Sequence, residues 1–257
     1  MEYFVQKQSV VRKIWGKSDT ILFIFAGASA EFALNKAVDW LYFTGRLPAD
    51  PIARLFSTVS YARQIVFAEK TAAEKAIDKI TAIHADIESK RGGVIPDWAY
   101  RDVLFMLIHY SIASFEVLEY KLTPKEKEDV YQVFYRMGLR MNIGSLPVTY
   151  EQWLPVREAH LEQDLQKTNY TIDLFKQYKK HLGPVRYKLL TEAQMLVAPQ
   201  KVKKLLNFGT VSLMNFLIPF YKLSRQLKLD SLLKSIILPS AYKPQIEALD
   251  QEPHNHS

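Results

Sequence analysis

The chain has 257 residues, of which 48% are hydrophobic, 12% are aromatic and only 9 are glycine. This composition supplies a sizeable core and argues against an all-β chain, which needs many tight turns. The complete lack of cysteine excludes disulfides, zinc fingers and thiolate chemistry, so any metal ligand must be a histidine, carboxylate, tyrosine or methionine.

The net charge of +7 is concentrated in the C-terminal third of the chain. Residues 1–175 hold 21 lysines and arginines against 22 acidic residues, whereas residues 176–234 hold 12 against 2. Such a basic region could meet anionic lipid headgroups, nucleic acid or an acidic partner. Nothing beyond the charge supports a nucleic-acid role, and we expect none.

Hydrophobic residues recur with helical spacing along nearly the whole chain, which predicts an all-α fold with a single multi-helix domain. An apolar helix rich in alanine and glycine is expected at residues 20–30. Its small side chains would let a flat ligand approach closely, although packing of another helix is the simpler alternative. A helical pattern continues from Glu31 to Phe43. An apolar run after basic residues is also typical of a secretion signal, but Asp19 beside the run favours a buried helix.

Capping residues, prolines and glycines predict the helices that follow. These are a helix that begins at Pro51 and helices at about residues 71–89, 98–120, 124–141, 149–168, 170–182, 185–196 and 200–207. The helix at residue 71 should begin with a capping box of Thr71 and Glu74. Pro155 should interrupt the helix in which it lies.

The last stretch, residues 210–257, is expected to form amphipathic basic helices and a polar tail, packed on a main helical domain at residues 1–209. Its leucines and phenylalanines lie between Lys222, Arg225 and Lys228, so these helices could rest on a membrane surface or close the core. No apolar run approaches the roughly 18–20 residues that cross a bilayer. We expect a cytoplasmic protein that can contact an anionic membrane peripherally.

Common catalytic motifs are absent from the sequence. There is no GxxxxGK[ST], GxGxxG, GxSxG or HExxH, and no histidine follows a glutamate by three positions, as a helical di-iron site requires. Haem is possible, because it needs one axial ligand, an apolar crevice and a cation or hydroxyl for its propionates. Arg54 and Thr58 share one helix face, and His84 lies on the next helix. Residues 26–30 and Phe105–His109 would form the walls of the haem crevice.

Simpler roles stay open for the same residues. Arg54 could pair with a neighbouring acid, and Thr58 could hydrogen-bond to its own helix. His84 could bond to Glu88 one turn further on. His109, at the end of the apolar VLFMLI run, could be a core histidine tied to a backbone carbonyl.

From about Trp15 to Phe208, the sequence resembles the family that joins the latex-clearing rubber oxygenases with the MpaB-type fungal oxygenases of the mycophenolic acid pathway. The matching features occur in order along most of the chain. They are the small-residue helix at 21–30, the RxxxT of Arg54 and Thr58, the AIHADIE segment with His84, the LFMLIHYSIAS segment with His109, and SLPVTYEQW at 145–153.

The resemblance implies a globin-like helical core that binds b-type haem. It implies that His84 is the proximal iron ligand and that Arg54 and Thr58 support the haem site. It further implies oxidative modification or cleavage of an apolar, isoprenoid-like substrate with dioxygen.

The distal side of the haem is the part for which the resemblance supplies no residue. Where the rubber oxygenases carry a distal lysine, this chain has Ser57. We therefore take Glu31 and His109 as the candidates for the distal acid–base group. The alternative to an enzyme is a helical module that binds lipid or a membrane surface without catalysis.

Overall fold

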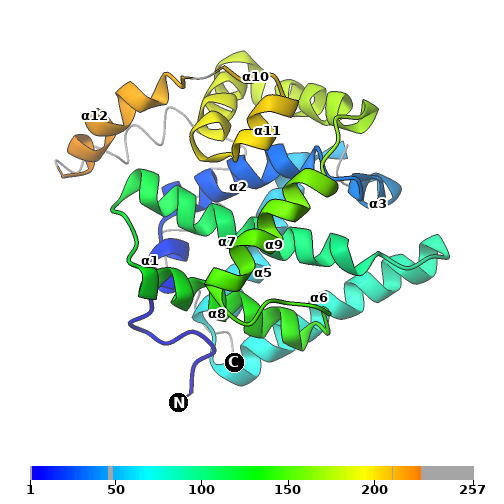
Figure 1. Ribbon diagram of the computed structural model, residues 1–257. Coiled ribbons are helices and arrows are strands. Elements are labelled where there is room, and N and C mark those ends of the chain that lie inside the picture. Colours follow the sequence, from blue (N-terminus) through cyan, green and yellow to red (C-terminus); the bar gives the residue numbers. More distant parts are fainter. Residues whose placement is uncertain (1, 46–48, 210, 227–257) are drawn as a thin grey trace.

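The computed structural model describes residues 2–45, 49–209 and 211–226, and within these ranges the chain is helical with no strand (Figure 1). The predicted all-α class and the single helical domain are confirmed. The globin-like arrangement stays a prediction. Two isolated antiparallel bridges join segments outside the helices, one between Tyr3 and Glu69 and the other between Asn35 and Leu165.

The first half of the chain forms α1 (Val10–Trp15), α2 (Ser18–Phe32), α3 (Val38–Phe43), α5 (Pro51–Phe67) and α6 (Lys70–Arg91). The predicted helical continuation from Glu31 to Phe43 is wrong, because the chain turns between α2 and α3. Asn35 explains the turn. Its side-chain oxygen accepts a hydrogen bond from the backbone N–H of Ala37 at 2.9 Å, a local bond that competes with helical pairing.

The start of α5 is confirmed, and the start of α6 differs from its prediction. The Asp50 side chain accepts hydrogen bonds from two backbone N–H groups in the first turn of α5. The capping box predicted at Thr71 is wrong, since α6 begins at Lys70 and has no side-chain cap from Glu69. The backbone N–H of Lys70 instead donates to the carbonyl of Glu2 at 2.9 Å, so a contact with the N-terminal segment fixes this start.

The second half forms α7 (Asp97–Leu118), α8 (Pro124–Arg140), α9 (Tyr150–Gln163), α10 (Asn169–Val197), α11 (Gln200–Leu205) and α12 (Met214–Gln226). The capping box at Thr123 is present. Pro155 lies inside α9 without ending it, and α9 stops earlier than predicted because the chain leaves it to pair Leu165 with Asn35. The break predicted at Gly183 and Pro184 is present, because α10 consists of two helical stretches that meet at a kink where Gly183 has a non-helical φ of 72° and ψ of 172°.

Helix α7 runs through the middle of the fold, and α2 packs along it in the most extensive helix–helix contact (Figure 1). The closest approach is at Gly27. A Cβ atom there would lie 2.2 Å from the Tyr110 ring and 2.7 Å from Val197 of α10. The small residues of α2 thus serve helix packing at this point, which was the simpler of the two alternatives.

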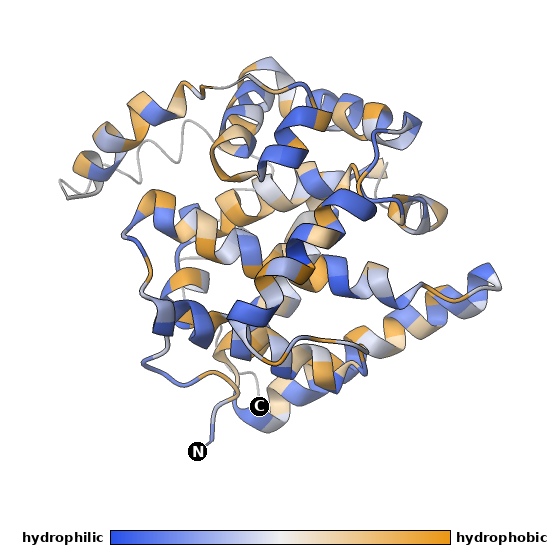
Figure 2. Ribbon diagram, in the orientation of Figure 1, coloured by the Kyte–Doolittle hydropathy of each residue, from blue (hydrophilic) through white to orange (hydrophobic). Residues whose placement is uncertain are grey.

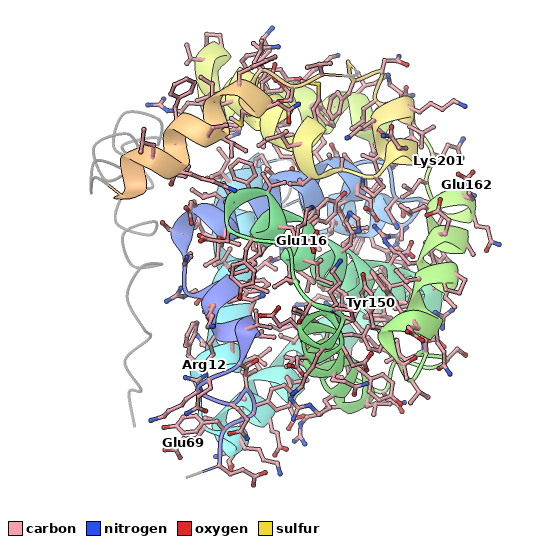
Figure 3. All side chains as sticks on the ribbon, turned by 60° about the vertical axis from the view of Figure 1, so that its left-hand side comes forward. Arg12, Glu69, Glu116, Tyr150, Glu162 and Lys201 are labelled. Atoms are coloured by element: carbon pink, nitrogen blue, oxygen red, sulfur yellow. The ribbon has the colours of Figure 1, made fainter. Side chains whose placement is uncertain are left out.

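Helices α10, α11 and α12 form an outer layer on the far side of α2 from α8 (Figure 1). An ion pair between Glu162 and Lys201 connects α9 to α11 at the surface (Figure 3). None of the described helices is both long and apolar enough to cross a membrane. Hydrophilic and hydrophobic residues instead alternate along the outer helices (Figure 2).

Candidate functional site

His84 of α6 lies with its ring against Tyr100 of α7, at a distance of 5.2 Å between ring centroids. Glu88, the simple partner considered for His84, is engaged elsewhere. It accepts hydrogen bonds from the backbone N–H of Ile95 at 2.8 Å and from the Tyr100 hydroxyl at 3.1 Å. The Nδ1 atom of His84 is buried and has no hydrogen-bond partner among the described residues. Five other buried side-chain atoms of the described residues also lack a partner, and among these positions a histidine nitrogen is suited to binding a group.

The surroundings of His84 favour the neutral form of its ring. Burial, and then the positive charge of Arg54, lower the pKa of His84 below 6.5, and the opposing effect of Glu88 is smaller. A neutral imidazole keeps a lone pair on one ring nitrogen, which a metal ion needs. The structure thus brings Arg54 and His84 within electrostatic range of each other.

Arg54 is oriented by two hydroxyl groups of its own helix. Its guanidinium donates hydrogen bonds to Thr58 at 2.9 Å and to Ser57 at 3.1 Å. The Thr58 hydroxyl also donates to the Arg54 carbonyl at 3.2 Å, so the bond of Thr58 to its own helix coexists with its contact to the guanidinium. Helix α5 packs against α6, which places the oriented cation on the side of His84.

Glu31, at the end of α2, lies in a second buried cluster and is only 1% exposed. Arg157 of α9 donates two hydrogen bonds to its carboxylate, at 2.6 and 2.5 Å, and the Tyr110 hydroxyl donates a third at 2.9 Å. Burial alone would lower the pKa of Arg157, but the charge and hydrogen bonds of Glu31 hold it above its usual value. Burial, and then the charge of Glu31, raise the pKa of Tyr110. The cluster is a matched ion pair with a neutral hydroxyl.

His109 lies next to this second cluster. Its Nε2 atom is 3.4 Å from the carbonyl oxygen of Val197, which is the core role considered for this histidine. Burial, and then the charge of Arg157, lower the pKa of His109 to about 4. The ring is therefore neutral at pH 7 and a weak base.

The predicted residues fall into two groups that the structure keeps apart. One group surrounds His84, and the other contains Glu31 and His109. Tyr100, which touches His84, and His109 are nine positions apart on α7, which corresponds to about 13.5 Å along the helix axis. The structure therefore does not place His109 or Glu31 against His84.

The family comparison covers both groups. Residues 13–218 match the family described as ER-bound oxygenase mpaB/B′/rubber oxygenase, catalytic domain. The chain belongs to this family. The family is one of oxygenases, which supports an oxygenase role for this member. Neither a curated protein nor a solved structure matches the chain.

Two residues of this MpaB/rubber oxygenase family member could not be selected from its sequence. Arg157 lies in a polar stretch of helix, where an arginine is usually solvated, and Tyr110 lies in an apolar stretch, where a tyrosine is usually core. Arg157 belongs to no motif, and Tyr110 lies in the LFMLIHYSIAS segment without a role of its own there. Only the fold shows that both contact Glu31.

A haem group fits the residues around His84 better than those around Glu31. The first group offers a neutral imidazole with a buried nitrogen that lacks a partner, and the cation of Arg54 could receive a propionate. In the second group both oxygens of the Glu31 carboxylate are already bonded to Arg157.

Proposed function

We propose that this family member is a haem-dependent oxygenase that modifies or cleaves an apolar, isoprenoid-like substrate with dioxygen. The observation that carries the proposal is the buried, neutral His84, whose Nδ1 atom has no partner among the described residues. Membership of an oxygenase family supports the reaction class. The family description names rubber, an apolar polymer, and this supports the class of substrate.

Three side chains would hold haem b, each in a different way. His84 would bind the iron. Arg54 would pair with a propionate, and Thr58 would keep the guanidinium in place through its 2.9 Å hydrogen bond. Haem iron, when bound, supplies the activation of dioxygen. The positive charge of Arg54 also keeps His84 unprotonated, so that the ring remains available as a ligand.

The absorption spectrum of the purified protein tests the cofactor. Protein expressed with ample haem supply should show a Soret band and about one haem per chain by the pyridine haemochrome assay. His84→Ala should lose both while circular dichroism shows an unchanged helix content. His181→Gln, which removes a partly exposed histidine of α10, should keep both. A wild-type protein without colour or iron would overturn the proposal.

The exposed face of α12 favours a second property, peripheral contact with an anionic membrane. Five large apolar side chains on this face are 54–72% exposed, namely Leu213, Phe216, Leu217, Phe220 and Leu223. Leu213 immediately precedes α12, and apart from the adjacent pair Phe216 and Leu217 the successive positions are three residues apart, which is close to one turn of a helix. The other side of α12 is attached to the domain, because Tyr221 donates to Asp19 at 3.0 Å and Lys222 to the Glu119 carbonyl at 3.2 Å.

The apolar face, rather than the three cations named from the sequence, is the better target for a membrane test. Lys222 is bonded to the protein, the side chain of Arg225 is not described, and Lys228 lies outside the described residues. A Phe216→Ser and Phe220→Ser double variant should lose most of its flotation with vesicles that contain phosphatidylserine. The exposed Val185 provides a control, since the Val185→Ser variant should float with the vesicles as the wild type does.

This membrane test also separates the enzyme from the non-enzymatic lipid-binding alternative. Vesicle binding by a protein that takes up no haem would favour the alternative. Equal flotation of the double variant and the wild type would exclude α12 as the contact surface.

A further inference from the structure

A third polar cluster lies next to the group around Glu31, since His160 follows Arg157 by three residues on α9 and the charge of Asp102 acts on Arg157. It contains Asp102 of α7, His160 of α9 and Asp164, the residue that ends α9. One ligand atom from each residue lies within 4.8 Å of the other two. The Nδ1 atom of His160 contacts Asp102 Oδ1 directly and lies 3.1 Å from Asp164 Oδ2. The geometry is that of three ligand atoms converging on one point.

A proton alone accounts poorly for this arrangement. One imidazole nitrogen carries at most one proton, yet two carboxylates direct an oxygen at the same nitrogen of His160. The Asp102 and Asp164 side chains are only 2% and 17% exposed.

The neighbouring cations Lys36 and Arg101 do not bind the carboxylates of this cluster. Lys36 and Arg101 act on Asp164 from a distance. The ammonium of Lys36 donates to the carbonyl of Gln163 at 2.5 Å, and the guanidinium of Arg101 donates to the carbonyl of Gly144 at 2.9 Å. Both are thus held by backbone oxygens and not by the cluster.

The surroundings hold the cluster in a fixed geometry. Asn35 donates from Nδ2 to Asp102 Oδ2 at 2.6 Å, and its amide cannot turn because its oxygen accepts the N–H of Ala37 at 2.9 Å. Asp102 Oδ1 is therefore held facing His160. The backbone segments 34–36 and 164–166 are joined by hydrogen bonds of 3.0 and 2.7 Å, which fix Asp164 beside Asn35. Support of this kind orients ligands in metal sites.

We propose that Asp102, His160 and Asp164 bind a divalent transition-metal ion, for which Zn²⁺ is the probe. One imidazole and two carboxylates suit Zn²⁺ and its first-row neighbours, with water in the remaining position. The ion joins α7 to the C-terminal end of α9. Its role is structural, and it does not depend on haem at His84.

Zinc titration of the purified protein tests this site. After removal of adventitious metal with a chelator, the wild type should bind one zinc per chain, counted by mass spectrometry of metals separately from iron. Its Tm should rise on zinc addition, because the ion binds the folded chain. His160→Gln and Asp164→Asn should each weaken binding by more than about 10-fold, and Asn35→Ser by about 10-fold.

A matched control distinguishes this site from general chelation. His181→Gln also removes one histidine, and it should bind zinc like the wild type. A wild-type protein that takes up no zinc would overturn the proposal, and that result needs no variant to fold. Equal zinc binding by the wild type and His160→Gln would overturn it as well.

Discussion

The groups around Glu31 and His84 are both buried and polar, and they differ in whether the central side chain has hydrogen-bond partners, although Nε of Arg157 in the first group also lacks one among the described residues. The Glu31 carboxylate takes three hydrogen bonds, from Arg157 and Tyr110. The His84 ring has a buried nitrogen without a partner among the described residues. A satisfied cluster stabilises the fold and has little capacity for a ligand. An unsatisfied one stabilises the free protein less and suits a bound group. We therefore infer a structural role for the group around Glu31 and a ligand-binding role for the group around His84.

The largest expected effect comes from breaking the satisfied cluster. Arg157→Met leaves the carboxylate of Glu31 buried without its cation, which should lower the free energy of unfolding by about 3–5 kcal/mol. In haem-free protein, His84→Ala should lower it by at most about 1 kcal/mol, because it removes an unsatisfied group. Urea unfolding followed by circular dichroism measures both. Equal losses would remove the distinction between the two regions.

The next effect concerns pH and His109, which borders the satisfied cluster. Its pKa of about 4 in the folded chain is below the ordinary value of 6.5, so the unfolded chain binds the proton first. The contribution of this group to the free energy of unfolding is present above pH 6.5. It is lost as the pH falls toward 4, which lowers the free energy of unfolding by up to roughly 3 kcal/mol. His109→Gln should flatten the loss of unfolding free energy between pH 7 and pH 4. The same pH dependence in the variant and the wild type would contradict a buried neutral His109.

The smallest effect tests the electrostatics of the unsatisfied region. Arg54 lowers the pKa of His84, so Arg54→Gln should raise it toward the ordinary value. The His84 ring signals in an NMR titration of haem-free protein report this pKa directly. Thr58→Ser, which keeps a hydroxyl for the guanidinium, should change it little. An unchanged pKa in Arg54→Gln would show that the guanidinium does not act on the ring.

Several local determinants could be predicted from the sequence, although the capping box expected at Thr71 was not among the correct ones. The cap at Asp50, the capping box at Thr123 and the four-residue spacing of Arg54 and Thr58 were all visible in it, because a helix fixes such relations within one turn. The turn at Asn35 was missed, since helical periodicity continues on both sides of it.

The satisfied cluster and the proposed metal site could not be found in this way. Arg157 is 126 residues from Glu31, and His160 is 58 residues from Asp102. No spacing rule connects residues so far apart, and each residue alone is typical of a solvated helix face. Their partners are set by how α2, α7 and α9 pack.

The most direct measurement of the central claim is the rescue of a His84→Gly variant by free imidazole. The variant should purify without a Soret band, and imidazole with added haem should restore a band of wild-type position, because the small ligand replaces the missing side chain. His109→Gly, treated in the same way, should keep its haem without imidazole. A His84→Gly protein that retains full haem in the absence of imidazole would contradict ligation by His84.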